Sequence, residues 1–468
     1  MKKSYLTVTD QFCGAGGSSI GATAAGAELR LALNHWQLAI ETHNSNFPNA
    51  LHDCTDISAC DPRRYPSTDI LITSPECTNH SLSKGKRRYK QPDLFGANVP
   101  DPAEERSRAT MWDVPRFAEY HRYNAIIVEN VVDARHWITW DAWLHAMQLL
   151  GYEHKIVFFN SMFAWPTPQS RDRMYVVFWR KDNARPDLDF HPAAHCEKCG
   201  KTVESVQSWK RHGQRWGRYG AQYVYRCPIC AAEVKPFYKP AASAIDWSLP
   251  APRIGDRDKP LKAKTLERIQ RGLDKYGRQD LIVANYTPGW SRPASDAPFG
   301  TITTYDHHAL VVQLSYGGGD RSRHVSDPMP TQTTRQDTAL VVPPFVVDLR
   351  GENAPKGIDS PLSTVVASGN HHALIMPYYS TGVAKPTSEP VPTVTTTDRH
   401  ALIVPQGNVP SVEDCGFRML RPHEIKAAMA FPTDYIVRGN NRDQVRQYGN
   451  AVTPPIMQML VERVVAAL

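Results

Sequence analysis

Short apolar runs alternate with polar or glycine-containing segments over the first 180 residues. The strand candidates are LTVTDQF, LRLALNHW, TDILITSP, NAIIVENV, HKIVFFNS and RMYVVFWR. Helical or looped segments separate these runs, so the pattern predicts an α/β domain with a doubly wound, mostly parallel sheet. Between Leu82 and Thr110 the chain turns basic and polar without a clear period, which predicts a long loop.

The pattern changes at about Pro186. A short cysteine-bearing module runs to about Lys235, and a stretch rich in Thr, Val and Pro follows. Units such as PFGTITTYDHHALVV and PMPTQTTRQDTALVV recur there at roughly 30 residues, a period typical of stacked supersecondary modules. Each unit holds two β-rich runs around a polar turn, which favours a hairpin. Helical patterning returns from about Gly416.

This organisation predicts four segments. We expect the first part of an α/β domain at 1–185, a zinc ribbon at 186–240, a β-rich, repeat-containing domain at 241–415 and helices at 416–468. With 468 residues the chain is long enough for two or three cores.

Composition narrows the class of protein. A net charge of +7 agrees with a polyanionic partner without proving one, because many enzymes are as basic. The sequence contains no apolar run of the roughly 18 residues that a membrane helix needs, and its start lacks a signal-peptide hydrophobic region. We therefore expect a soluble, cytoplasmic monomer that does not bind membranes. Scattered cysteines besides two CxxC pairs argue against a disulfide framework.

A strand, a glycine turn and a helix are predicted in VTDQFCGAGGSSIG. Glycines at 14, 16 and 17 would let the backbone turn sharply and approach a ligand, although a turn of this kind is as often structural. At the end of the second strand, where a nucleotide site usually keeps an acid for the ribose, the chain has Asn34. Asp56 could accept a hydrogen bond from an adenine amino group.

Three further segments bring reactive side chains to strand ends. Cys77 follows the apolar strand of ILITSPECTNHS, where a cysteine is suited to nucleophilic attack or is simply a small buried residue. IIVENV puts Glu129 at the same predicted edge, and a buried glutamate is costly without a partner. QSRDR adds Arg171 and Arg173, of which one could pair with that glutamate and touch a substrate carbonyl.

Two CxxC pairs form the other strong motif. Cys196 and Cys199 are followed, after a basic stretch, by Cys227 and Cys230. This spacing is typical of four-cysteine structural zinc. Basic and aromatic residues alternate between the pairs, so the module is either a DNA-contacting face or a solvated knuckle that braces its neighbour. The candidate DNA contacts are Lys210, Arg211 and Arg215.

Taken together, these motifs resemble the DNA (cytosine-5) methyltransferase family, over about residues 4–180 and 416–468. The matches follow the family's order: DQFCGAGG, SPEC, ENV, QSRDR, RMLRPHEIKAAMAFP and QYGNAVTPP. The resemblance implies the S-adenosylmethionine-dependent methyltransferase fold. It implies that 1–185 begins a catalytic domain that the helices at 416–468 complete, and that 241–415 is a target recognition domain. It also implies a cofactor site whose members on this chain would be Phe12, Gly14, Gly16, Gly17, Asn34, Asp56, Pro75 and Asn450.

The resemblance further implies a mechanism. Cys77 would add to carbon 6 of a flipped-out cytosine, Glu129 would hold ring nitrogen 3, and the arginines would orient the base. The basic loop after the nucleophile would close on duplex DNA through Lys84, Lys86, Arg87 and Arg88. A prokaryotic or phage setting is expected, and a cognate restriction endonuclease in a restriction-modification system is an open possibility for a partner.

Two positions depart from the family pattern. Glu76 precedes the nucleophile where the family has proline, and Asn34 stands where an acid is expected. Three alternatives stay open: an RNA or tRNA cytosine methyltransferase, a catalytically silent DNA-binding homologue, and an enzyme with a changed donor or target base. Of these, only the last rests on Glu76.

Overall fold

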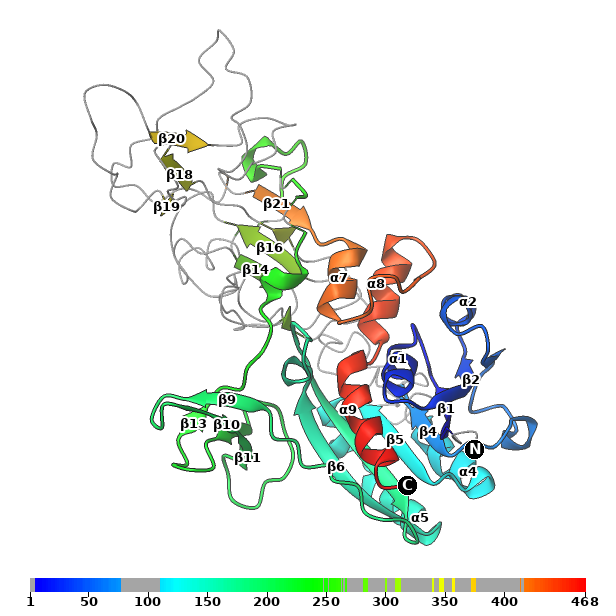
Figure 1. Cartoon of the computed structure of the whole chain (residues 1–468). Coiled ribbons are helices and arrows are strands. Elements are labelled where there is room, and N and C mark those ends of the chain that lie inside the picture. Colours follow the sequence, from blue (N-terminus) through cyan, green and yellow to red (C-terminus); the bar gives the residue numbers. More distant parts are fainter. Residues whose placement is uncertain are drawn as a thin grey trace, which may run out of the picture.

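A computed structural model describes most of the chain outside residues 77–109 and a long region between 262 and 415. The described residues are 5–76, 110–246, 248–250, 252–261, 263, 266, 281–284, 299–300, 308–312, 339–340, 345–348, 356–357, 372–375, 413 and 416–468. Figure 1 shows the catalytic sheet with its helices, the cysteine module as a separate lobe, and the β-strands of the repeat region beyond α7.

A seven-stranded sheet forms the centre of the molecule, with strand order β3-β2-β1-β4-β5-β8-β6. All neighbouring strands are parallel except β8, which is antiparallel to both β5 and β6. The strands are β1 (Thr7–Gln11), β2 (Glu28–Asn34), β3 (Leu51–Cys54), β4 (Ile70–Thr73), β5 (Ala125–Asn130), β6 (Tyr152–Asn160) and β8 (Asp172–Arg180). The predicted mostly parallel α/β sheet is confirmed.

Burial explains why the central strands read as continuous apolar runs. Every residue of β4 and β5 is buried, as expected for parallel strands covered on both faces. All six strand candidates contain a strand. The edge strand β3 was missed because its four residues, LHDC, are partly polar and only half-buried or exposed.

Helices cover both faces of this sheet. The α-helices are α1 (Gly17–Ala24), α2 (Gln37–Asn46), α4 (Asp113–His121), α5 (Trp140–Leu149), α7 (Pro422–Ala428), α8 (Asn441–Asn450) and α9 (Pro454–Val465). Short 3₁₀ turns lie at Pro62–Arg64 (η1), Thr110–Trp112 (η3), Val132–His136 (η4), Ser161–Phe163 (η5), Ala241–Ala244 (η6) and Ile254–Asp256 (η7). No helix within the described ranges is both long and apolar enough to span a membrane.

The C-terminal helix packs against the first helix (Figure 1). A side chain at Gly21 would bring its Cβ within 2.5 Å of the Pro454 carbonyl oxygen, so the two backbones approach as closely as glycine allows. Prolines 454 and 455 begin α9, where their missing N–H groups cost nothing. The end of the chain therefore belongs to the same core as its beginning.

The cysteine module consists of two small antiparallel sheets. The first pairs β9 (Ala193–Cys196) with β10 (Lys201–Glu204), and the second contains β11 (Val206–Trp209), β12 (Tyr223–Arg226) and β13 (Glu233–Val234). Its aromatic side chains pack on the catalytic domain: Trp209 lies against Phe158, and Tyr219 and Tyr225 lie against Phe163.

Backbone strands are described for part of the repeat region. Strands β14 (Leu281–Ala284), β16 (His308–Val312), β17 (Ala339–Leu340) and β21 (Gly416–Met419) form one sheet. A second contains β18 (Phe345–Asp348), β19 (Lys356–Gly357) and β20 (His372–Ile375), while β7 (Gln169–Ser170) pairs with β15 (Phe299–Gly300). The second run of three repeat units is thus in strands. The fourth unit and most of the first runs lie outside the described residues, so the hairpin stays a prediction.

Candidate active site

The carboxyl end of β1 is the point at which the strand order reverses. β2 lies on one side of β1 and β4 on the other. In open α/β sheets such a switch point leaves a crevice for ligands. The glycine loop starts there, and Phe12 adopts a φ of 58°, a left-handed conformation that is uncommon for a bulky residue.

The three glycines of this loop serve two purposes. At Gly16 and Gly17 an added Cβ would lie 2.3 Å from the Tyr435 hydroxyl and 1.9 Å from the Val452 carbonyl oxygen, respectively. These two positions therefore let the C-terminal segment pack on the loop. Around Gly14, with a φ of +51°, the nearest atom to such a Cβ is the Phe12 carbonyl oxygen at 3.8 Å. Space for a ligand is left at this glycine.

Polar atoms meet on both faces of β1. The buried Asp10 carboxylate accepts hydrogen bonds from the hydroxyls of Ser18 and Ser19 at 2.5 and 2.6 Å. Burial raises the pKa of Asp10 to about 6, against smaller lowering by the two serines. On the neighbouring strands, Gln11 and Thr73 face each other in register, and their buried side-chain polar atoms have no hydrogen-bond partner. Such atoms favour a polar ligand or water nearby.

The other expected cofactor residues lie at the end of β2, shortly after β3 and β4, and at the end of α8. The buried Asn34 accepts a hydrogen bond from the Trp36 backbone N–H at 2.9 Å, so its amide oxygen closes the turn after β2. Asp56 is exposed and caps the Ser58 N–H at 3.0 Å. Pro75 is buried after β4, and Asn450 is exposed at the end of α8.

Glu129 and Arg173 form an ion pair at the carboxyl end of β5. Arg173 Nε lies 2.8 Å from Glu129 Oε1, and the side chains are 12% and 10% exposed. The pair arises because β8 runs antiparallel to β5, with Asn130 opposite Met174. The guanidinium thus holds a carboxylate that burial alone would disfavour.

The start of the SPEC segment lies beside this pair. The Asn130 side-chain amide donates a hydrogen bond to the Pro75 carbonyl oxygen at 3.3 Å. Cys77, two residues further on, lies outside the described residues. So do Lys84, Lys86, Arg87 and Arg88.

Arg171 points in another direction. It is buried, and its Nη1 donates to the Gly449 carbonyl oxygen in α8 at 3.2 Å, whereas Arg173 reaches Glu129. The structure therefore brings one arginine of QSRDR to the glutamate and uses the other to join the start of β8 to the C-terminal helices.

The four cysteines of the module meet at one point. All four sulfur atoms lie within 4.8 Å of one another, with Cys196 and Cys230 3.6 Å apart and Cys199 and Cys227 3.9 Å apart. Tetrahedral zinc with bonds of about 2.3 Å would hold its sulfur ligands about 3.8 Å apart. The cluster can therefore hold a metal ion.

One end of the cysteine module reaches the catalytic edge. Arg218 pairs with Asp133 at 2.6 Å, and the Trp216 ring lies 4.6 Å from that of His136, both partners being in η4 directly after β5. Lys210, Arg211 and Arg215 in the same segment are exposed. Arg218 and Trp216 therefore contact η4, while the three exposed cations have no hydrogen bond or ion pair to the described residues of the α/β domain.

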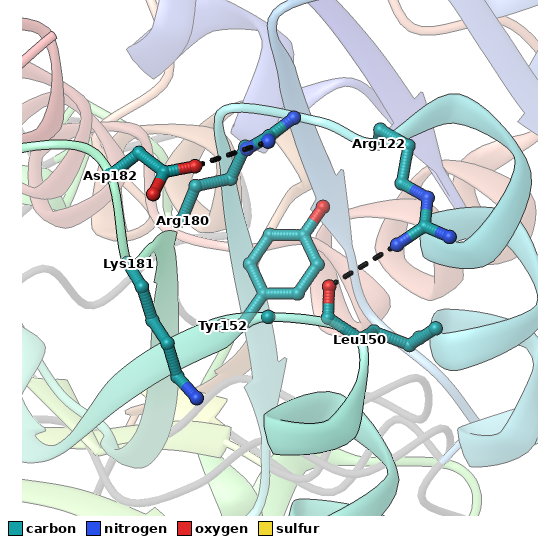
Figure 2. A pocket seen from close by; sticks show the side chains of 7 residues that line it. Arg122, Leu150, Tyr152, Arg180, Lys181 and Asp182 are labelled. Atoms are coloured by element: carbon teal, nitrogen blue, oxygen red, sulfur yellow. Dashed lines mark hydrogen bonds and ion pairs between the residues drawn. The ribbon is translucent and has the colours of Figure 1, made fainter.

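A small cavity of 160 Å³ lies at the end of the sheet opposite to the candidate active site (Figure 2). It is lined by Arg122, Tyr152, Arg180 and Lys181, among others, where β6 begins and β8 ends. Arg122 is bound to the Leu150 carbonyl oxygen and Arg180 to Asp182 (Figure 2). The catalytic candidates lie at the other ends of these strands, so this cavity takes no part in their chemistry.

Comparison with known protein families assigns the chain. The model of the C-5 cytosine-specific DNA methylase family matches residues 6–216 and 350–466. The chain belongs to this family. The first matched range includes the glycine loop, the Glu129 strand and the arginine segment. The second includes α9, which packs against the first helix.

Individual relatives match more narrowly. The type II methyltransferase M.HgiCII of Herpetosiphon aurantiacus is 24% identical over 40% of this chain and 40% of its own length. M.DdeI of Desulfomicrobium norvegicum is 26% identical over 38% of this chain and 41% of its own. The chain thus spans about 40% of the length of these relatives. The structure of an Entamoeba histolytica methyltransferase aligns over 99% of both chains, with 12% identity and a TM-score of 0.49.

Several residues of the site were missed from the sequence. Asp10 and Asp172 are visible in DQF and QSRDR, but only the fold shows that one faces α1 and the other the cysteine module. His35 gave no signal, because nothing in a single sequence indicates that it meets Glu76.

Proposed function

We propose that the chain is a DNA (cytosine-5) methyltransferase that acts on a flipped-out cytosine in a specific duplex sequence. The observation that supports this most is the Glu129–Arg173 pair, 2.8 Å apart at the sheet edge where the SPEC segment begins. In such a pair the carboxyl group, when protonated, can donate a hydrogen bond to the ring nitrogen, and the guanidinium can donate to the keto oxygen of the same base.

The chain's own residues would act in turn. The Cys77 thiolate adds to carbon 6 of cytosine, and the ring electrons move to carbon 5. Glu129 donates a hydrogen bond or a proton to nitrogen 3, while Arg173 holds the 2-keto oxygen. Carbon 5 would then take the methyl group, and the donor would leave as a neutral thioether. A water-derived base would remove the proton that carbon 5 still carries, the ring double bond would reform, and the Cys77 thiolate would leave. Arg171 would position the strand that carries Arg173 through its bond to Gly449.

S-adenosylmethionine would supply the methyl group. The open space at Gly14 and the unpartnered polar atoms of Gln11 and Thr73 fit a polar nucleoside ligand at this crevice. Phe12, Pro75, Asp56 and Asn450 are further candidates for contacts with this ligand, and Gly16, Gly17 and Asn34 would shape the walls of the crevice.

Structural zinc is proposed for the cysteine cluster. Its four sulfurs have the spacing that tetrahedral zinc requires, and four thiolates leave no open position for catalysis. The module would brace the catalytic edge. Its exposed residues Lys210, Arg211 and Arg215 would contact DNA phosphates beside the flipped base, as would the basic loop that contains Lys84, Lys86, Arg87 and Arg88.

Double-stranded DNA is the proposed partner, with residues 241–415 as the recognition domain between 186–240 and the completing segment 416–468. A restriction endonuclease of the same system is a further candidate partner. Type II methyltransferases such as M.HgiCII are among the relatives of this chain.

Bisulfite sequencing of plasmid DNA from cells that express the protein tests the proposal. Cytosines protected in one short sequence context, and unprotected with a Cys77→Ser variant, are expected. Absence of protected cytosines with the folded wild-type protein would overturn DNA methylation as its activity. Undiminished methylation by the Cys77→Ser variant would overturn the role of the cysteine.

A further inference from the structure

The side chain of Asn34, the last residue of β2, makes a hydrogen bond within the protein. The Asn34 amide oxygen accepts the Trp36 backbone N–H at 2.9 Å, and the residue is buried. In nucleotide sites of this topology, the end of the second strand usually supplies a carboxylate to the ribose hydroxyls. Asn34 lacks the charge of that carboxylate, and its amide oxygen already accepts one hydrogen bond within the protein, so another group has room to take that role.

The next residue meets a carboxylate from across the crevice. His35 Nδ1 lies 3.7 Å from Glu76 Oε1. His35 follows β2 and Glu76 follows β4, the two strands that flank β1 on either side. The pair therefore spans the carboxyl end of β1, where the glycine loop begins.

Exposure distinguishes this pair from a structural one. The side chains of His35 and Glu76 are 54% and 39% exposed, whereas those of the Glu129–Arg173 pair are almost buried. Exposed ion pairs add little to stability. A ligand that enters the crevice can reach the Glu76 carboxylate without breaking into the core.

We infer that Glu76 is the ribose-binding carboxylate of this chain, and that His35 positions it. In this chain the ribose-binding acid would follow β4 instead of ending β2. His35, directly after β2, would hold its carboxylate from the other side of the crevice. The ligand class is an adenosine derivative with free ribose hydroxyls. This inference rests on the proposed methyltransferase function.

Calorimetric titration with two probes tests it. One probe is S-adenosylhomocysteine, and the other is its analogue without the 2′- and 3′-hydroxyls. The wild-type protein is expected to prefer the hydroxylated ligand about 10-fold to 100-fold, as for hydrogen bonds to a charged group. Glu76→Gln is expected to lose most of this preference by weakening only the hydroxylated ligand, and His35→Ala is expected to lose part of it.

Two further variants control the test. Glu28→Gln removes an exposed carboxylate at the far end of β2, which pairs with Arg30 at 3.2 Å, and should leave both affinities unchanged. Asn34→Ala breaks the turn contact and should lower the melting temperature while it keeps the preference for hydroxyls. If Asn34 were the ribose ligand instead, this variant would lose the preference.

The outcomes separate the two claims. Full preference for the hydroxylated ligand in a folded Glu76→Gln protein would overturn the role of Glu76 and leave the proposed function intact. A wild-type protein that binds neither probe would overturn the proposed cofactor and this inference with it. Equal binding of both probes by the wild type would overturn the inference alone.

Discussion

The Asp172 carboxylate accepts a hydrogen bond from the Tyr219 backbone N–H at 2.9 Å. This bond joins the cysteine module to the first residue of β8, directly before the arginine that holds Glu129. Burial raises the pKa of Asp172 to about 6, with the Tyr219 N–H and nearby groups opposing the shift. The module is thus attached one residue before Arg173. A displacement of Asp172 would therefore also move Arg173 relative to Glu129.

Asp172→Ala is expected to slow methyl transfer about 10-fold, because Arg173 loses the fixed start of its strand. Its affinity for S-adenosylhomocysteine should not change, since that crevice lies at β1 and β4. Asp172→Asn keeps an acceptor oxygen and should restore most of kcat. Single-turnover kinetics and calorimetry measure the two quantities. An equal loss in the alanine and asparagine variants would argue against positioning through the Tyr219 contact.

Removal of the metal is expected to disrupt the cysteine module and its attachment to Asp172. One zinc ion per chain should be found by elemental analysis, and Cys227→Ser should lose it and lower the melting temperature, because folding of such modules depends on the metal. Cys54→Ser is the matched control, since Cys54 is an exposed free cysteine elsewhere in the catalytic domain. Full zinc content in the Cys227→Ser protein would rule out the four-sulfur site.

The sequence was sufficient for six of the seven strands of the central sheet. Strands such as β5 are buried along their whole length, so they appear in the sequence as continuous apolar runs and can be predicted from it. The sequence did not predict which of the two arginines, Arg171 or Arg173, pairs with Glu129. Both arginines precede or begin the same strand, and only the antiparallel register of β8 decides which one meets β5. The contact between His35 and Glu76 depends in the same way on the strand order, which periodicity does not encode.

Glu129→Gln tests the acid of the proposed mechanism. A glutamine keeps the size of the side chain but supplies no acidic proton to nitrogen 3, so methyl transfer should fall about 10²-fold to 10⁴-fold. DNA binding by the folded variant, measured by fluorescence anisotropy, should persist. Glu153→Gln, at an exposed position of β6, is the control and should be fully active. Activity of Glu129→Gln within a few-fold of wild type would remove this residue from the mechanism.

Arg418 and Glu424 form the most buried ion pair among the described residues, with Nη1 and Oε2 2.8 Å apart and side chains 8% and 0% exposed. Glu424 also accepts the backbone N–H groups of Arg421 and Asp246, so it joins the start of α7 to the segment after the cysteine module. Arg418→Met would leave this carboxylate buried without its cation, at a cost of about 3–5 kcal/mol in unfolding free energy.

Urea unfolding measures this cost against Arg30→Met. Arg30 pairs with Glu28 at the surface, with exposures of 54% and 47%, and its loss should cost less than about 1 kcal/mol. Similar costs for the two variants would mean that solvent reaches Glu424 in solution.

The buried carboxylate of Asp10 predicts a pH dependence of stability. Burial raises its pKa from 3.8 to about 6 in the folded protein, although Ser18 and Ser19 donate to it. The folded state therefore binds the proton more tightly than the unfolded state. Stability from this group is greatest below about pH 4 and declines as the pH rises to about 6, by about 3 kcal/mol in total. His43 opposes the trend, because burial lowers its pKa to about 3 and costs stability below its ordinary pKa.

A comparison with Asp10→Asn isolates the carboxylate, since His43 is present in both proteins. Asparagine keeps an oxygen that accepts from the two serines but does not titrate. Unfolding free energies from urea titrations between pH 4 and pH 7 should therefore differ by an amount that changes with pH. The wild type should lose about 2.4 kcal/mol relative to the variant across this range. Asp141→Asn, at an exposed position of α5, should run parallel to the wild type. Parallel curves for wild type and Asp10→Asn would mean that Asp10 ionises as readily in the folded protein as in the unfolded chain.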